Sequence, residues 1–172
     1  PLVTTDTDAF YEADLDMVDI CTPNFLHLEQ AQQAATRGCH LYVEKPLALN
    51  VKEGEELNDI ADREGRILMV GHILQYHPAV LKLADFIKTG GLGKIRYIYS
   101  NRLNIGKIRA EENILWSFAP HDISVMLGLL EEEPDDVDCR GESYLNTGVP
   151  DVTMTTLSFP SGVRGHIFVS WL

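Results

Sequence analysis

The chain is poor in cysteine, which limits the roles that sulfur chemistry can play. Its 172 residues contain three cysteines, Cys21, Cys39 and Cys139, which lie far apart in the sequence. None has a partner at the two- to four-residue spacing of zinc ligands, so the sequence indicates neither a metal site nor a disulfide framework. We expect reduced, mostly buried thiols.

Basic residues are also scarce, and this scarcity excludes a class of partners. There are 14 lysines and arginines against 26 acidic residues, giving a formal net charge of −12. Such a charge repels nucleic acid backbones and anionic membranes. We therefore expect neither nucleic acid nor a membrane as a partner.

Long apolar runs and a secretion signal are missing as well. No apolar run approaches the roughly 18 residues of a membrane-spanning helix, and the first residues carry no signal-peptide pattern. The expected location is therefore the cytoplasm. Hydrophobic residues still make up 45% of the chain, enough to bury a core.

Strand and helix patterns alternate in the first half of the chain. Apolar runs predict strands over 17–21, 40–43 and 67–70, and helical spacing predicts helices over 25–37 and 51–64. Each helix is followed by a glycine, Gly38 or Gly65, which favours termination. This order predicts a parallel sheet, built by right-handed crossovers and covered by helices on both faces.

The pattern changes after Pro78. A helix is predicted over 79–88, a half-buried strand over 95–103, an apolar helix over 117–130, and strands over 137–145, 152–159 and 163–171. Strands that follow one another without helices favour an antiparallel sheet. We place a domain boundary near residues 72–78, which gives domains of residues 1–75 and 76–172.

The tripeptide Glu44-Lys45-Pro46 directly follows the second strand. A parallel sheet gathers the carboxyl ends of its strands around a ligand crevice, so this lysine is predicted to face a ligand. Pro46 restricts Lys45 to extended geometry and allows a cis bond. The alternative is a solvated Glu44–Lys45 ion pair worth less than about 1 kcal/mol.

Two other polar segments can be explained by local structure alone, without a role in ligand binding. Thr22-Pro23-Asn24 follows the first strand, where Asn24 or Thr22 suits a helix cap, and His27 on its own is typical of a helix surface. His121-Asp122 is predicted near the start of an apolar helix, where Asp122 complements the helix dipole. The residues His72 and His77 are five apart without a carboxylate, so no metal site is predicted.

Taken in order and at this spacing, Thr22-Pro23-Asn24, His27 and Glu44-Lys45-Pro46 resemble the paired motifs of the Gfo/Idh/MocA oxidoreductases. The resemblance covers nearly the whole chain but only the middle of a family member. It implies the C-terminal half of a Rossmann-like NAD(P)-binding domain over 1–75. A partial α+β substrate and oligomerisation domain with a mainly antiparallel sheet follows over 76–172.

The resemblance also implies roles for individual residues and a nicotinamide cofactor, NAD or NADP. Lys45 and His121 match catalytic positions that share proton transfer during hydride transfer to or from a sugar. The matching cofactor-binding positions are Thr22, Pro23, Asn24, His27, Glu44, Lys45 and Pro46. Ser117 stands where the family usually has an aspartate, which weakens a mechanism centred on His121 alone. Gln75 stands where the family commonly has an arginine, so one charge contact is absent.

A modest basic cluster precedes His121 and supplies the candidate substrate contacts. The cluster consists of Arg102, Asn104, Lys107 and Arg109. The predicted substrate contacts are Arg102, Asn104, Arg109 and the nearby Trp116. Because positive charge gathers here in an acidic chain, we expect a nucleotide-linked sugar rather than a free sugar or polyol. The alternative is a set of ordinary surface residues.

A dinucleotide-binding half normally begins with a strand, a glycine-rich turn and a helix, and this chain has no such turn. We therefore expect a piece of a longer enzyme. Family members commonly associate through the open face of the second sheet, so the resemblance implies a homo-oligomer. The alternative function is a non-catalytic dinucleotide-sensing or binding protein of the same fold. Ser117 and Gln75 leave this alternative open, whereas the presence of both Lys45 and His121 counts against it.

Overall fold

The computed structural model describes residues 3–105, 112–145 and 147–172. The chain divides into two compact units, Pro1–Gly71 and His72–Leu172. Each unit has a hydrophobic core of its own. Among the described residues, no helix combines the length and apolar character needed to cross a membrane.

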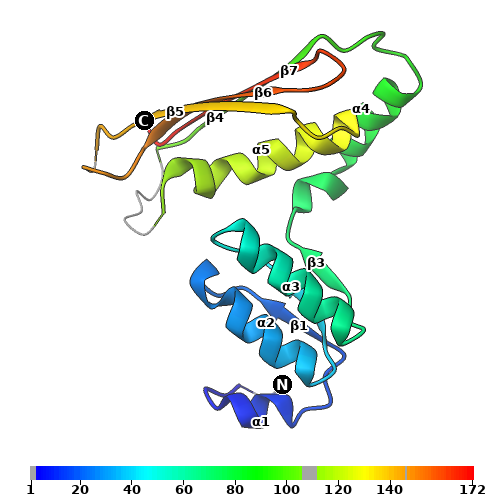
Figure 1. Cartoon of the computed structure of the whole chain (residues 1–172), viewed down its shortest axis with the longest axis vertical. Helices are drawn as coiled ribbons and strands as arrows, with labels where there is room; N and C mark the ends of the chain where they lie inside the picture. Colours follow the sequence, from blue (N-terminus) through cyan, green and yellow to red (C-terminus); the bar gives the residue numbers. More distant parts are fainter. Residues whose placement is uncertain (1–2, 106–111, 146) are drawn as a thin grey trace. The chain divides into compact units, whose positions relative to one another are not determined.

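The first unit is built around a parallel sheet of three strands in the order β1-β2-β3 (Figure 1). Its elements are, in chain order, α1 (Thr7–Tyr11), β1 (Met17–Ile20), the 3-10 turn η1 (Asn24–Leu26), α2 (His27–Thr36), β2 (His40–Val43), α3 (Val51–Arg63) and β3 (Leu68–Val70). The predicted parallel sheet is confirmed, with strand ends one residue or less from the expected ones.

Helices α2 and α3 pack on the same face of this sheet, because both crossovers run in the same direction across it. Val18, Ile20, Leu41 and Val43 point into the core beneath them. On the other face Met17 is exposed. The expectation of helices on both faces is thus wrong for the described residues of this unit.

The second unit is a four-stranded sheet in the order β4-β7-β6-β5. Its elements are the 3-10 turn η2 (Ile73–Tyr76), α4 (Pro78–Lys88), β4 (Tyr97–Leu103), α5 (Ile114–Leu130), β5 (Asp136–Glu142), β6 (Val152–Ser158) and β7 (Arg164–Ser170). Strands β5, β6 and β7 form the predicted antiparallel arrangement. The first strand, β4, departs from it by pairing parallel to β7.

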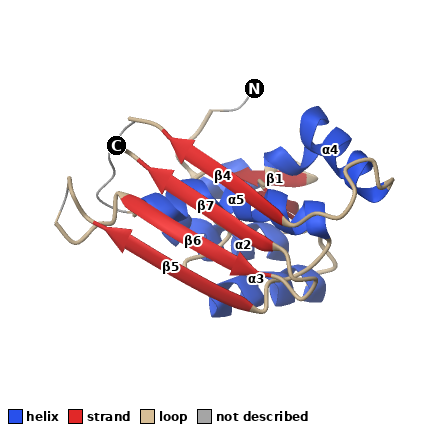
Figure 2. Cartoon of the chain, turned by 90° about the horizontal axis from the view of Figure 1, so that it is seen from above, coloured by secondary structure: helices blue, strands red, loops and turns tan. Residues whose placement is uncertain are grey.

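Helix α5 lies along one face of this sheet, behind the strands in Figure 2. Ile114 and Met126 of the helix pack against Leu157 and Ile167 of the sheet. Gly165 allows this approach, since a Cβ there would lie 2.9 Å from the Met126 sulfur. No described helix of the unit covers the opposite face, where the large side chains of Tyr97, Tyr99, Leu103 and Met154 are exposed.

Two sequence-based boundaries in this unit are wrong for identifiable reasons. Helix α5 begins at Ile114 rather than 117, because the Asn113 side chain caps it by accepting the Trp116 N–H; Pro120 therefore lies inside the helix. Strand β5 ends at Glu142 rather than 145. The buried Asp151 carboxylate accepts the N–H groups of Tyr144 and Leu145, which diverts them from the sheet.

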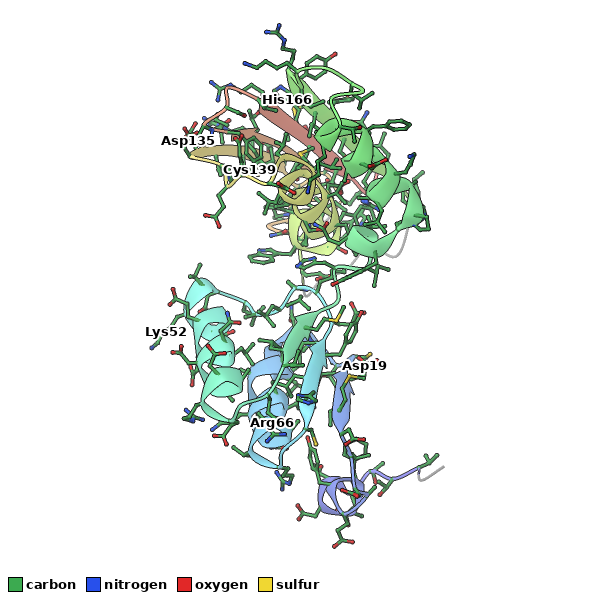
Figure 3. All side chains as sticks on the ribbon, turned by 90° about the vertical axis from the view of Figure 1, so that its right-hand side faces the viewer. Asp19, Lys52, Arg66, Asp135, Cys139 and His166 are labelled. Atoms are coloured by element: carbon green, nitrogen blue, oxygen red, sulfur yellow. The ribbon has the colours of Figure 1, made fainter. Side chains whose placement is uncertain are left out.

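The cysteines also differ from expectation. Cys39 is buried, but Cys21 and Cys139 are exposed. Cys139 lies on the edge strand β5 of the second unit (Figure 3), beyond the part of the sheet that α5 contacts. Edge position, which sequence periodicity does not reveal, decides its exposure.

Candidate functional site

The carboxyl ends of the three parallel strands meet at one edge of the first unit. Ile20, Val43 and Val70 are aligned by strand pairing. The hydrogen-bond ladder continues one step further: Glu44 N–H donates to the Ile20 carbonyl (3.0 Å), and Gly71 N–H donates to the Val43 carbonyl (2.8 Å). Residues 21, 44 and 71 therefore lie side by side along this edge.

The Glu44 carboxylate is held close to the backbone at this edge. A Cβ built on Gly71 would lie 3.2 Å from the carboxyl carbon and both carboxylate oxygens, so only glycine fits there without displacement. One of these oxygens, Oε2, also accepts the Lys45 N–H (3.2 Å). The Glu44 carboxylate thus fixes the backbone of the candidate catalytic lysine. This contact is a hydrogen bond to the Lys45 backbone, whereas the ion pair considered from the sequence would involve the Lys45 side chain.

The segment that carries Lys45 is anchored further along as well. The Lys45–Pro46 peptide bond is cis, and Pro46 is buried. Leu47 and Ala48 pack against the core of the unit. Asn50 then caps α3 by accepting the Glu53 N–H (3.0 Å). Half-buried Lys45 is therefore presented by a segment fixed at both ends.

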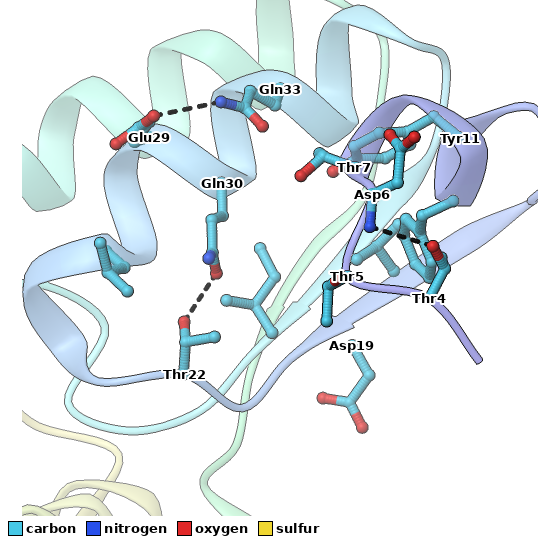
Figure 4. Close-up of a pocket in the computed structure, with 14 residues that line it drawn as sticks. Thr4, Thr5, Asp6, Thr7, Tyr11, Asp19, Thr22, Glu29, Gln30 and Gln33 are labelled. Carbon is cyan, nitrogen blue, oxygen red and sulfur yellow. Dashed lines mark hydrogen bonds between the residues drawn. The ribbon is translucent and has the colours of Figure 1, made fainter.

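The Thr22-Pro23-Asn24 segment does not cap α2 as expected. Neither η1 nor α2 has a side-chain cap, because the 3-10 turn intervenes and the Leu26 N–H donates to the Pro23 carbonyl (2.9 Å). The Thr22 hydroxyl instead donates to Gln30 Oε1 (2.6 Å), as Figure 4 shows. Asn24 is half-buried and Pro23 exposed at the start of this turn.

His27 is buried, with 1% of its surface exposed. Its Nε2 lies 2.9 Å from the Thr22 carbonyl oxygen, and its Nδ1 lies 3.2 Å from the Leu47 carbonyl oxygen. The interpretation of His27 as a surface helix residue is therefore wrong. Its ring lies between the backbones of the two motif segments.

A hollow of about 490 Å³ lies beside β1 in the same unit (Figure 4). Its lining includes Thr5, Asp6 and Tyr11 near α1, Asp19 of β1 and Gln33 of α2. Of the residues predicted to form the site, only Thr22 lines it. Most of the candidate site, including Lys45, is therefore not part of this hollow.

Cys21 lies at the same sheet edge, and its thiol is influenced by acidic neighbours. Its Sγ donates to Asp19 Oδ1 (3.2 Å), and this hydrogen bond raises the pKa of Cys21, with burial and the charges of Asp19 and Glu44 acting in the same direction. A raised pKa leaves less reactive thiolate at pH 8. Cys21 should therefore react slowly for an exposed thiol.

We predict that Asp19→Asn accelerates iodoacetamide labelling of Cys21 at pH 8 about threefold, since it removes the charge that disfavours the thiolate. Peptide-resolved mass spectrometry measures the rate at each cysteine. Exposed Cys139 is the internal control, and its rate should stay constant. An unchanged Cys21 rate would contradict the role assigned to Asp19.

In the second unit, His121 is half-buried within α5. Ser124 Oγ donates to its carbonyl oxygen (2.9 Å). The neighbouring Asp122 does not complement a helix N-terminus, because it lies nine positions from the cap Asn113. Ser117 is buried one turn earlier, in the position where the family pattern has a carboxylate.

Asp122 instead joins α5 to β4. Its Oδ1 accepts the Ser100 hydroxyl (2.6 Å) and Arg102 Nη2 (3.2 Å), and its Oδ2 accepts Arg102 Nε (2.9 Å). Side-chain exposure is 9% for Asp122 and 36% for Arg102. The guanidinium predicted to bind substrate is thus largely engaged within the protein, and sequence reasoning missed both Asp122 and Ser100 as its partners.

Two of the other predicted substrate contacts lie on described residues of the second unit. Trp116 lies in the first turn of α5 and is 42% exposed, while Asn104 follows β4 with its N–H donating to the Ser170 carbonyl (3.1 Å). Arg109 and Lys107 lie outside the described residues. Their proximity to His121 stays a prediction.

Gln75 and His77 have structural contacts in the second unit. Gln75 Nε2 donates to the Ser124 carbonyl and so joins η2 to α5. His77 Nδ1 accepts the Ala79 N–H (3.1 Å) and caps α4.

No three His, Cys, Asp or Glu side chains come together as metal ligands in the parts of the chain that are described.

Comparison with protein families identifies the chain. Residues 2–72 match a family described as "Oxidoreductase family, NAD-binding Rossmann fold", and residues 80–172 match the "GFO/IDH/MocA C-terminal domain". The chain belongs to the Gfo/Idh/MocA oxidoreductase family. The resemblance read from residues 22–27 and 44–46 is therefore confirmed.

Individual relatives of this Gfo/Idh/MocA chain are enzymes by name. A UDP-N-acetylglucosamine 3-dehydrogenase from Acidithiobacillus ferrooxidans is 29% identical over 159 residues, which are 92% of this chain and 49% of that protein. A 2,7-anhydro-N-acetylneuraminate hydratase from Mediterraneibacter gnavus is 32% identical over 155 residues, covering 89% and 40%. The chain spans about half the length, or less, of these relatives.

Solved structures confirm the fold. The crystal structure of GenD2 from gentamicin A biosynthesis, in complex with NAD, superposes with a TM-score of 0.92 at 22% identity. It covers 99% of this chain and 52% of that one. The predicted class, a partial Rossmann-like parallel sheet followed by an α+β domain, is thereby confirmed.

Proposed function

We propose that the protein containing this chain is an NAD- or NADP-dependent dehydrogenase that transfers a hydride to or from a hydroxyl-bearing carbon of a sugar or nucleotide sugar. The observation that carries the proposal is the placement of Lys45. It lies two residues beyond the end of the parallel strand β2, and Glu44 and the packed 46–48 segment hold its backbone. A cation held at the carboxyl edge of such a sheet suits an anion that develops on a bound ligand.

The side chains at this edge fit the nicotinamide end of a dinucleotide. The Thr22 hydroxyl donates to Gln30 and so offers an acceptor, while the Asn24 amide offers both a donor and an acceptor, the types that a carboxamide and ribose hydroxyls require. Gly71 leaves the edge open beside Glu44. When bound, the nicotinamide ring supplies the hydride acceptor or donor. Thr22, Pro23, Asn24, Glu44 and Pro46 are the proposed cofactor neighbours, with His27 behind them.

Lys45 and His121 are the proposed proton-handling groups. As the substrate C–H bond loses its hydride, the hydroxyl proton must leave and negative charge develops on oxygen. The Lys45 ammonium stabilises that charge, and either the His121 imidazole or a deprotonated Lys45 amine accepts the proton.

For the substrate we propose a nucleotide-linked sugar, with Asn104, Arg109 and Trp116 as contacts. Support comes from the basic cluster in the sequence and from the relative named UDP-N-acetylglucosamine 3-dehydrogenase. Arg102 contributes less than the sequence suggested, because two of its N–H donors, one on Nε and one on Nη2, serve Asp122. Diphosphate binding then depends more heavily on Lys107 and Arg109.

The test is a substrate panel of UDP-sugars, free hexoses and inositols, assayed with NAD and NADP on the full-length gene product. We expect kcat/KM for a UDP-sugar to exceed that for any free sugar at least about tenfold, since a diphosphate adds charge-assisted hydrogen bonds. Absorbance of the reduced ring measures turnover. A preferred free polyol would overturn the nucleotide-sugar proposal, and dinucleotide binding without any turnover would favour the non-catalytic sensor.

We further propose a cytoplasmic homo-oligomer. The face of the second sheet opposite α5 exposes Tyr97 and Tyr99 on β4 and Met154 on β6, the two strands that flank β7. Large exposed side chains gathered on one sheet face are typical of an association site. A second copy of the same face is the proposed occupant.

A further inference from the structure

The His27 side chain lies between the two backbone segments that carry the candidate site, and its ring faces both of them. It is the first residue of α2, and its ring nitrogens face the carbonyl oxygens of Thr22 (2.9 Å) and Leu47 (3.2 Å). Those carbonyls belong to backbone segments 20 or more residues apart that follow two neighbouring strands. A single buried side chain therefore spans both motifs.

The two carbonyls that face His27 belong to the same backbone segments that carry the candidate site residues. Thr22 immediately precedes Pro23-Asn24, and Leu47 follows Lys45 by two residues. The ring is 1% exposed, so it interacts with the protein interior and not with solvent. A neutral imidazole carries one N–H, so the tautomer decides which carbonyl accepts it.

We propose that His27 is a positioning residue, which sets the spacing between segments 22–24 and 45–47 and thereby places Lys45 against the cofactor-binding edge. The inference rests on the proposed function of Lys45, but it assigns His27 no contact with the cofactor. A displacement of about 1 Å in a positioned group is enough to lower turnover about 10²-fold. The spacing of the two segments is therefore a determinant of activity.

Two variants separate hydrogen bonding from packing. His27→Phe keeps a ring but removes both ring nitrogens, whereas His27→Gln keeps an amide with two N–H groups. We expect His27→Phe in the full-length gene product to increase amide exchange about tenfold in peptides covering 22–26 and 45–50. We expect exchange in His27→Gln to stay within about threefold of the unmodified protein.

His40→Phe is the matched control. The His40 Nδ1 accepts the Ile67 N–H (3.0 Å) at the amino end of β2, the opposite end from Lys45. This substitution also removes a histidine hydrogen bond from the first unit. We expect faster exchange around residue 67 and unchanged exchange in both motif segments.

Kinetics on the UDP-sugar panel distinguish positioning from general stability. A merely structural His27 would lower the melting temperature and the active fraction but leave kcat per folded molecule and KM unchanged. We expect His27→Phe to lower kcat per folded molecule at least about tenfold and His27→Gln to recover most of it. His40→Phe should leave both constants unchanged.

The His27 variants give results that can overturn the positioning role. If exchange in both segments and kcat per folded molecule are unchanged in His27→Phe, the inference is wrong. If His27→Phe does not fold, His27→Asn replaces it, because the shorter asparagine amide cannot reach both carbonyls. Equal protection of the two segments from amide exchange in the Asn and Gln variants would also overturn the inference. Inactivity of the unmodified protein contradicts the proposed function alone, because the exchange experiment needs no turnover.

Discussion

Replacing Lys45 with alanine in the full-length gene product should lower turnover about 10²-fold or more, the usual loss when a positioned acid, base or charge stabiliser is removed. The fold should survive, because the anchoring contacts of this segment use the Lys45 backbone and the side chains of Glu44, Pro46 and Leu47. Cofactor affinity should fall less than turnover. Steady-state kinetics, dinucleotide titration and a melting curve measure the three quantities.

Lys45→Arg and Lys52→Ala are the matched variants for this experiment. Arginine keeps the positive charge but cannot deprotonate in a protein, so partial activity in Lys45→Arg would assign the lysine to charge stabilisation. Lys52 is an exposed lysine on α3, on its outer side in Figure 3, and its loss should leave turnover unchanged. Turnover of Lys45→Ala within about threefold of the unmodified enzyme would remove Lys45 from the mechanism.

The strongest sequence-based predictions concern features set by neighbouring residues. The three parallel strands were predictable because apolar runs and glycine-terminated helices alternate over short distances. The position of Lys45 at the carboxyl edge of the sheet followed from the same pattern, because the residues that come just after a parallel strand lie at that edge whatever the rest of the fold does. Strand pairing then aligned residues 21, 44 and 71 as expected for that edge.

Other features depended on partners distant in the sequence. His27 resembled a surface residue because its second carbonyl partner, Leu47, lies 20 residues away. Asp122 resembled a helix-terminal acid because Ser100 and Arg102 lie 22 and 20 residues before it. Similarly, a run of strands does not reveal that β4 pairs parallel to β7, since that choice follows from how α5 crosses the sheet.

The pairing of Asp122 with Arg102 predicts the second large effect, which is on stability. Arg102→Ala should lower the free energy of unfolding by about 2 kcal/mol, because it removes two of the three hydrogen bonds that described side chains donate to the buried Asp122 carboxylate. The expected cost lies below the 3–5 kcal/mol typical of a fully buried pair, since Arg102 itself is 36% exposed. Urea unfolding measures it.

Arg140→Ala is the matched control, because it also removes an arginine that pairs with an aspartate in this unit. The Arg140–Asp138 pair lies on strand β5 with side-chain exposures of 84% and 62%, so its loss should change the free energy of unfolding by less than about 0.5 kcal/mol. If Arg102→Ala is as mild as Arg140→Ala, the anchoring role is wrong. Substrate binding by Arg102 is tested on the folded fraction of two variants. If Arg102→Ala raises KM for a UDP-sugar and Arg102→Lys does not, Arg102 binds the substrate as the sequence suggested. The reason is that the point charge of a lysine suffices for a phosphate but does not replace the two-donor contact with Asp122.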